Sequence, residues 1–153
     1  MVLSRRTTQY PEWMWIINRW WKYKVKGTEF AHFPYSSICL NRNFEGRTHR
    51  DMNNFGPSVI IAVGEYQDGQ FMYWESDNRM LKIEDLEANQ MAKPCFVDIK
   101  ERPFLYDGRR MHTSESAKGE RWSLIFYTHK WYDKIPKGTR EFRIDQGTPW
   151  PVF

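Results

Sequence analysis

Residues 121–129 read RWSLIFYTH, a run of aromatic and branched side chains without Gly or Pro. This composition predicts a β-strand. Because side chains in a strand alternate between its two faces, one face of the run is apolar and carries Trp122, Leu124, Phe126 and Thr128. The opposite face carries Arg121, Ser123, Ile125, Tyr127 and His129. A half-buried strand usually shows solvated Lys or Glu on that side, so a row with a guanidinium, a hydroxyl, a ring and an imidazole predicts a binding surface.

Short strand-like runs surround this segment and are separated by Gly, Asn, Asp and Pro. Additional strands are predicted near residues 36–40, 58–64, 70–75 and 95–99. The acidic segment 81–89 is predicted to be a helix or a loop, and residues 146–153, with two prolines, are predicted to be a packed or frayed extension. A series of short strands with frequent turn residues is typical of an all-β sandwich or barrel.

The N-terminal segment has a helical period instead. Four apolar residues recur at i, i+3, i+4 and i+7: Trp13, Ile16, Ile17 and Trp20. Pro11 suits the first turn of a helix and Gly27 suits its end. We expect this helix to pack its apolar face on the protein core, because amphipathic stripes usually face a core.

Basic residues are concentrated in the same segment. Residues 1–26 hold six Lys and Arg against Glu12 alone, a net charge of +5, whereas the remainder holds 17 against 18, a net charge of −1. Four of the eight Trp also lie in this segment. Basic groups and aromatic rings interleave in this way on nucleic-acid-binding surfaces, so the basic side of the helix is able to meet phosphates.

Size and composition favour one globular domain covering residues 1–153. No stretch approaches the ~20 apolar residues of a membrane span, and the N-terminus lacks the apolar run of a secretory signal. Cys39 and Cys95 are the only cysteines, too few for a disulfide framework or a four-cysteine zinc site. We therefore expect an intracellular protein without a membrane partner.

Candidate metal ligands begin at His49-Arg50-Asp51. In an extended segment residues i and i+2 point the same way, so His49 and Asp51 are able to share one metal ion while Arg50 points elsewhere. His112 is the candidate for a third ligand. Two His and one carboxylate form the facial triad that holds Fe(II) and leaves positions for a co-substrate and dioxygen. Arg121, nine residues after His112, is suited to bind the carboxylate of 2-oxoglutarate.

Two segments, THRDMNNFGPSVIIAVGEY and MHTSESAKGERWSLIFYTHK, resemble the catalytic core of the TET (ten-eleven translocation) and base J-binding protein family of Fe(II)/2-oxoglutarate dioxygenases. The resemblance implies a mostly β fold, a double-stranded β-helix or jelly roll, over residues 36–131. Residues 1–27 would form a helix packed on it, and residues 140–153 a C-terminal extension. It also implies hydroxylation of the 5-methyl group of a pyrimidine, 5-methylcytosine or thymine, in a nucleic acid, with Fe(II), 2-oxoglutarate and O2.

The resemblance also assigns roles to individual residues. His49, Asp51 and His112 match the iron ligands, and Arg121 with Ser123 matches the 2-oxoglutarate site. Three further positions match the residues that hold a flipped base, by stacking or at its edge: Tyr127, His129 and Asn54. Asn41 is assigned to the co-substrate and Asn43 to the base, with turn formation before Gly46 as an equal alternative for both.

The substrate polymer stays open at this point. Animal members of the family carry a Cys-rich zinc-binding region, which two cysteines and four histidines cannot supply. Single-stranded DNA, duplex DNA and RNA are all candidates, with DNA expected over RNA and a nuclear location in a eukaryotic cell. No obligate protein partner is indicated. Two alternatives remain: an oxygenase acting on a protein side chain or a metabolite, and a β-sandwich that binds nucleic acid without iron.

Overall fold

A computed structural model describes residues 5–152 of the chain. The chain forms two compact units, and the single-domain organisation expected from the sequence stays a prediction. One unit comprises Met1–Ser37 and Thr128–Phe153, and the other comprises Ile38–Tyr127. We call them the helical unit and the β unit. Residues 1–4 and 153 of the predicted N-terminal and C-terminal segments lie outside the described residues.

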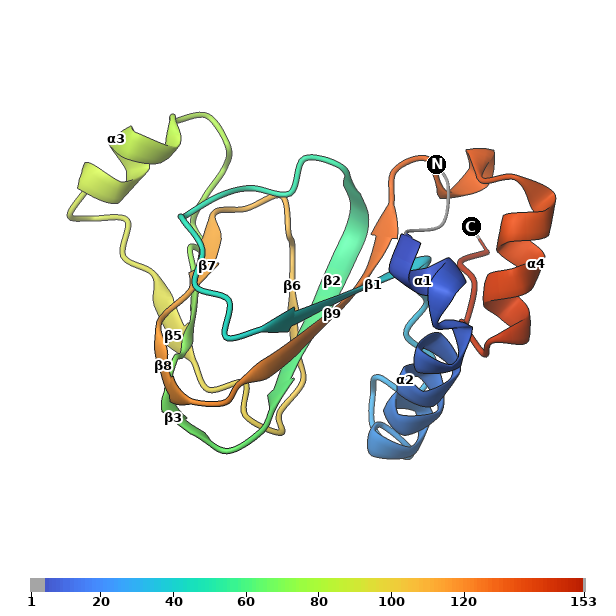
Figure 1. The fold of residues 1–153 in the computed structure, drawn as a ribbon. Helices are drawn as coiled ribbons and strands as arrows, with labels where there is room; N and C mark the ends of the chain where they lie inside the picture. Colours follow the sequence, from blue (N-terminus) through green and yellow to red (C-terminus); the bar gives the residue numbers. More distant parts are fainter. Residues whose placement is uncertain (1–4, 153) are drawn as a thin grey trace. The chain divides into compact units, whose positions relative to one another are not determined.

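The strands form three sheets (Figure 1). A four-stranded sheet has the order β1-β9-β2-β6 and contains β1 (Ser37–Arg42), β9 (Trp122–His129), β2 (Asn54–Val63) and β6 (Phe104–Tyr106). A three-stranded sheet has the order β5-β4-β7 and contains β5 (Cys95–Val97), β4 (Phe71–Tyr73) and β7 (His112–Ser114). The third sheet pairs β3 (Tyr66–Asp68) with β8 (Ala117–Gly119). The mostly β prediction is confirmed, and in residues 5–152 the sheets do not close into a barrel.

The core of the β unit lies between its sheets. One hydrophobic cluster combines residues of the four-stranded sheet with residues of both smaller sheets: Ile60, Ala62, Tyr66, Phe71, Tyr73, Ile99 and Tyr106. Within it, Phe71 of β4 meets Tyr106 of β6 with ring centroids 4.9 Å apart. The four-stranded and three-stranded sheets therefore face each other and share one interior. Polar side chains that enter this interior must find partners there.

Each of the five predicted strand regions contains a strand, whereas β3, β6, β7 and β8 were not predicted. These four strands have three residues each, too few to show an alternating pattern in the sequence. The acidic segment contains a short helix, α3 (Ile83–Ala88), which agrees with one of its two predicted states.

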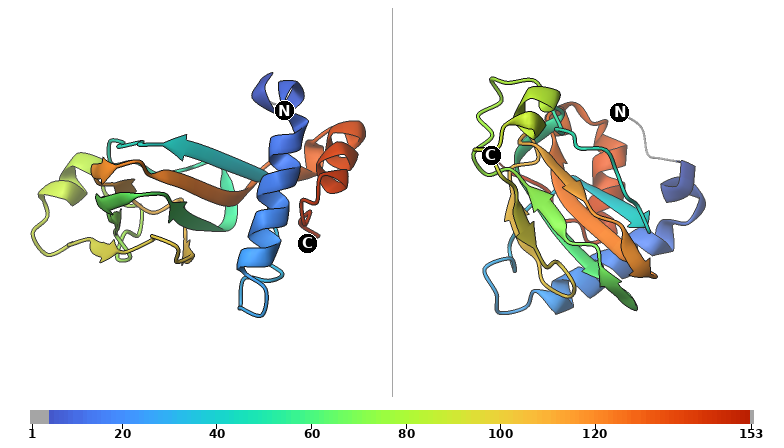
Figure 2. Two further views of the ribbon diagram at one scale, coloured as in Figure 1. Left: turned by 60° about the horizontal axis from the view of Figure 1, so that its bottom comes forward. Right: turned by 90° about the vertical axis from the view of Figure 1, so that its left-hand side faces the viewer.

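The helical unit contains α1 (Arg5–Gln9), α2 (Pro11–Lys24), a 3-10 turn at Tyr132–Lys134, and α4 (Lys137–Asp145). The C-terminal segment returns alongside α2 (Figure 2). The predicted helix is thus present, and within its own unit it contacts the C-terminal segment. Residues 146–152 are a packed extension, since Pro149 O accepts a hydrogen bond from Tyr35 N. No helix among the described residues is both long and apolar enough to span a membrane.

The prediction of which face of α2 is buried is wrong: the buried positions lie about one residue later in the sequence than predicted. Trp13 and Ile16 are 50% and 53% exposed, while Asn18 and Trp21 are buried. Hydrogen bonds of Asn18 explain this rotation, because its amide donates to Gln146 O at 2.8 Å and accepts from the Tyr35 hydroxyl at 2.6 Å. A buried amide must be satisfied, and these two partners fix which side of the helix faces inward.

Candidate metal centre

Two histidines face each other across neighbouring segments of the β unit. His49 and His112 form an antiparallel bridge in which each main-chain N–H donates to the other's carbonyl, at 3.1 and 3.0 Å. Residues paired in this way carry their side chains on the same face, and the ring centroids lie 4.4 Å apart. The main chain therefore brings the two imidazoles together although 62 positions separate them in the sequence.

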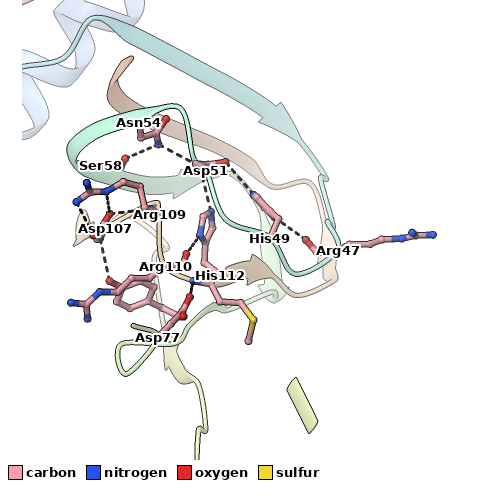
Figure 3. A network of polar contacts seen from close by, with 12 residues as sticks. Arg47, His49, Asp51, Asn54, Ser58, Asp77, Asp107, Arg109, Arg110 and His112 are labelled. Carbon is pink, nitrogen blue, oxygen red and sulfur yellow. Dashed lines mark hydrogen bonds and ion pairs between the residues drawn. The ribbon is translucent and has the colours of Figure 1, made fainter. Parts of the chain in front are cut away.

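Asp51 completes the cluster (Figure 3). Its carboxylate oxygens lie 3.6 Å from His49 Nε2 and 3.5 Å from His112 Nε2. One candidate ligand atom from each of the three residues lies within 4.8 Å of the others. The predicted alternation also holds for Arg50, which points away to Asp77. The three residues assigned to one metal ion by sequence therefore lie together.

Hydrogen bonds of the Nδ1 atoms fix the orientation of both imidazoles. His49 Nδ1 lies 2.8 Å from Arg47 O, and His112 Nδ1 lies 2.8 Å from Arg110 O. A carbonyl only accepts, so each Nδ1 is the donor, and each Nε2 is the ring nitrogen that faces Asp51. Metal-ligating histidines commonly donate their second nitrogen to a carbonyl. Both rings are therefore held with Nε2, the nitrogen able to bind a metal, toward the Asp51 carboxylate.

Asp51 is held ionised by its neighbours. Burial opposes ionisation, but the hydrogen bond and charge of His112, followed by His49 and Asn54, keep the pKa of Asp51 below its ordinary value. Asn54 Nδ2 lies 3.5 Å from Asp51 Oδ2 and 3.2 Å from Ser58 Oγ. Asn54 is buried at the start of β2, and its amide orients the Asp51 carboxylate.

Gly108 permits this arrangement. A Cβ at this position would lie 2.8 Å from Asn54 Nδ2 and 3.5 Å from Asp51 Oδ2. The Gly108 carbonyl also accepts from Asp51 N at 2.7 Å. The main chain at Gly108 must therefore approach the Asp51 segment closely, which only a residue without a side chain allows.

Asp77 ties the two ligand segments together and was not predicted. Its buried carboxylate accepts two hydrogen bonds from Arg50, both at 2.7 Å, and one from Met111 N at 2.7 Å. Arg50 stands between His49 and Asp51, and Met111 precedes His112. Asp77 therefore fixes both segments from outside the cluster. Its only sequence signal, a polar Ser-Asp-Asn run, indicates a turn.

Arg121 is 1% exposed and is bound by three main-chain carbonyls. Its Nη1 donates to Gly69 O and Glu115 O, and its Nη2 to Phe44 O, at 2.7, 2.9 and 2.6 Å. These bonds use three of the five guanidinium N–H groups. No ion pair within residues 5–152 includes Arg121. Burial lowers the pKa of Arg121, with smaller opposing effects of Tyr66 and Glu45, and the guanidinium stays charged.

A buried hydroxyl lies beside the cluster. The Tyr106 ring lies 5.2 Å from the His112 ring, and the Tyr106 hydroxyl has no hydrogen-bond partner among the described residues. Burial raises the pKa of Tyr106, and the charges of Asp51 and Cys39 add to this effect. Sequence patterning could not identify Tyr106, because a tyrosine in a three-residue strand resembles any core aromatic.

The remaining predicted residues of the β unit have varied surroundings. Ser123 is buried on β9, on the same face of the strand as Tyr127, and Arg121 directly precedes the strand. Asn41 Oδ1 lies 3.6 Å from the Cys39 thiol. Asn43 has a left-handed φ of 47°, and it exchanges two hydrogen bonds with the Arg121 main chain, at 2.7 and 2.8 Å. The turn-forming alternative is therefore the one that the Asn43 contacts favour.

His129 belongs to the helical unit. Its main-chain N–H donates to Ser36 Oγ, and its Nδ1 accepts from Trp131 N at 3.2 Å, which leaves Nε2–H as a donor. Burial, followed by the charge of Lys130, lowers the pKa of His129. Its ring lies 5.4 Å from the Trp131 ring. The base-edge assignment of His129 stays a prediction.

No protein-family model matches the chain, and the search of curated proteins gives no match.

Proposed function

We propose that this protein is an Fe(II)/2-oxoglutarate-dependent dioxygenase that hydroxylates the 5-methyl group of a pyrimidine in nucleic acid. The observation that carries the proposal is the cluster of His49, Asp51 and His112, in which both Nε2 atoms face one shared carboxylate. Two imidazoles and one carboxylate are the ligand set of non-haem iron oxygenases. The facing antiparallel sheets are compatible with the jelly roll that the family resemblance implies.

The spacing of the ligand atoms suits one shared metal ion. Metal bonds of about 2.1 Å separate neighbouring ligand atoms by about 3 Å at right angles and by about 3.4 Å at tetrahedral angles, and the Asp51 oxygens lie 3.5 and 3.6 Å from the two histidine nitrogens. Bound Fe(II) would supply oxygen activation with 2-oxoglutarate as the electron source. The protein contributes fixed ligands, since Asn54 orients Asp51, and Asp77 holds both ligand segments.

Arg121 supports the co-substrate assignment. A guanidinium buried without a carboxylate partner is costly, and neutral carbonyls compensate the charge only in part. Two N–H groups remain for a further acceptor. We assign the distal carboxylate of 2-oxoglutarate to these groups, with Ser123 on the same face of β9, and we assign the Tyr106 hydroxyl as a further donor within the interior.

The nucleic-acid substrate rests on the resemblance around Tyr127 and His129. A methyl group on a base inside a duplex is out of reach until the base is unstacked and held elsewhere. Tyr127 would stack on that base, and His129, with Nε2–H free to donate, would contact its edge. DNA is the expected polymer, with 5-methylcytosine or thymine as the oxidised base.

Mass spectrometry of treated oligonucleotides tests the proposal. The protein is incubated with Fe(II), 2-oxoglutarate and O2 and with DNA and RNA oligonucleotides that contain 5-methylcytosine or thymine. We expect succinate and a digested pyrimidine heavier by one oxygen, both absent in Asp51→Ala and present in Asp85→Ala, which changes an exposed carboxylate of α3. Turnover of 2-oxoglutarate without any oxidised pyrimidine would reject the substrate, and absence of turnover would reject the enzyme.

A further inference from the structure

Large apolar side chains gather on the solvent side of α2. The exposed members on the helix are Trp13, Trp15, Ile16 and Tyr23, the last 82% exposed, and the exposed Tyr10 directly precedes the helix. The opposite side of the same helix is buried through Asn18 and Trp21. Single exposed apolar residues are ordinary, but several on one helix form a patch of the kind that marks an interaction site. The orientation of α2 is fixed by Asn18, so this patch is a stable feature of the helical unit.

Positive charges are interleaved with these rings. The Arg19 guanidinium lies over the Trp15 ring, 5.1 Å from its centroid, and the rings of Tyr10 and Trp13 lie 5.9 Å apart. The same unit carries a second such pair, with Lys130 Nζ 4.8 Å from the Trp131 centroid. The helical unit holds eleven Lys and Arg against five Asp and Glu, a net charge of +6, whereas the β unit holds twelve against fourteen, a net charge of −2.

We propose that the exposed face of α2 binds single-stranded nucleic acid. Arg19 and Lys22 would meet phosphates, while Trp13, Trp15 and Tyr23 would stack on bases. Unpaired bases expose their faces to such rings, whereas a duplex keeps them stacked internally. An interfacial membrane helix instead separates its apolar face from its charged face, and on α2 the two kinds of side chain are mixed. This inference deepens the proposed function, on which it rests for the substrate polymer.

The inference is tested by measuring how a fluorescent oligothymidylate of twelve nucleotides binds to the full chain without metal. Trp15→Ala should weaken binding about 5- to 150-fold, since stacking contributes about 1–3 kcal/mol per base. Arg19→Gln should reduce the slope of log affinity against log salt by about 0.7. Phe96→Ala and Arg102→Gln are the matched controls, because they remove an exposed ring and an exposed guanidinium of the β unit, and both should leave affinity within about 2-fold.

Each outcome decides the inference. Equal affinities of wild type, Trp15→Ala and Arg19→Gln would overturn it, as would tight binding to anionic phosphatidylserine vesicles with no binding to the oligonucleotide. Preferential binding to the matching duplex would overturn the assignment to single strands. Asp51→Ala should bind the oligonucleotide like the wild type, so loss of oxidation with retained binding rejects the proposed function alone. Retained oxidation with no role of α2 in binding rejects this inference alone.

Discussion

The β unit holds the polar side chains of its candidate metal centre in fixed positions, whereas the helical unit leaves several rings and cations of α2 exposed. His49, Asp51 and His112 have their orientations set by main-chain carbonyls and by Asn54. On α2, by contrast, Trp13 and Trp15 are about half exposed, and the Arg19 guanidinium lies over the Trp15 ring. Chemistry at one atom requires a preorganised site, while contact with a flexible polyanion requires exposed and adaptable groups.

The largest effect that separates the two units is expected from Asp51→Ala. This change removes the only carboxylate of the candidate triad, so turnover of 2-oxoglutarate should fall below detection while oligonucleotide affinity is unchanged. Succinate formation and fluorescence anisotropy on the same preparations measure the two quantities. Turnover equal to that of Asp85→Ala would show that the triad is not the metal site.

Asp77→Asn should have the largest effect on stability. It leaves the Arg50 guanidinium, which is mostly buried, without its charge partner, a change that costs roughly 3–5 kcal/mol of the free energy of unfolding. Urea denaturation measures this loss. Asp98→Asn, which breaks an exposed pair with Arg102, should cost less than about 1 kcal/mol. Equal costs for the two variants would mean that Asp77 does not hold the ligand segments.

The same carboxylate predicts a pH dependence. Burial opposes ionisation of Asp77, but Arg50 and two main-chain N–H groups hold its pKa below the ordinary value of 3.8. A lowered folded-state pKa contributes stability that is fully present above the unfolded pKa and is lost as pH falls through the folded pKa. Stability should therefore decline below pH ~4, and Asp77→Asn should flatten that decline. An unchanged acid limb in the variant would contradict this.

Arg121→Met should weaken 2-oxoglutarate binding by roughly 2–5 kcal/mol, because the co-substrate carboxylate loses its charge-assisted partner. The variant should also melt earlier, since three carbonyls lose their donor. Calorimetric titration measures the affinity for 2-oxoglutarate, and a melting curve measures the loss of stability. Arg42→Met, at an exposed pair with Glu120, is the control. A lower melting temperature with unchanged co-substrate affinity would make Arg121 a purely structural residue.

Tyr127→Ala and His129→Ala should lose oxidation of nucleic acid but keep Fe(II) and 2-oxoglutarate binding. Loss of the stacked Tyr127 ring should weaken base binding by about 1–3 kcal/mol. His32→Ala, which changes an exposed histidine, should behave like the wild type. A parallel loss of melting temperature and co-substrate binding would indicate that the two side chains only fill the core.

Asn54→Ala should have the smallest effect, about a 10-fold loss of Fe(II) affinity, because its amide supports Asp51 without binding metal itself. The ratio of oxidation on different bases should not change. A shift in base preference at unchanged Fe(II) affinity would restore the base-edge role that the sequence resemblance implies.

The sequence was informative where a strong local pattern coincides with a long element. β9 and the His-x-Asp alternation were predictable because side chains in a strand have a period of two. The rotation of α2 was not, since it depends on hydrogen bonds of Asn18 to Gln146 and Tyr35, which lie far away in the sequence. Asp77 and Gly108 act through contacts of the same long-range kind, and no local pattern indicates these contacts.

Visible absorption of the anaerobic protein with Fe(II) and 2-oxoglutarate tests the central claim most directly. Chelation of the co-substrate to iron in the triad should produce a charge-transfer band in the wild type that requires both additions. The band should be absent in Asp51→Ala, should require more 2-oxoglutarate in Arg121→Met, and should be unchanged in Trp15→Ala. A wild-type protein without the band, or a band of equal intensity in Asp51→Ala, would contradict the assignment of His49, Asp51 and His112 as an iron site.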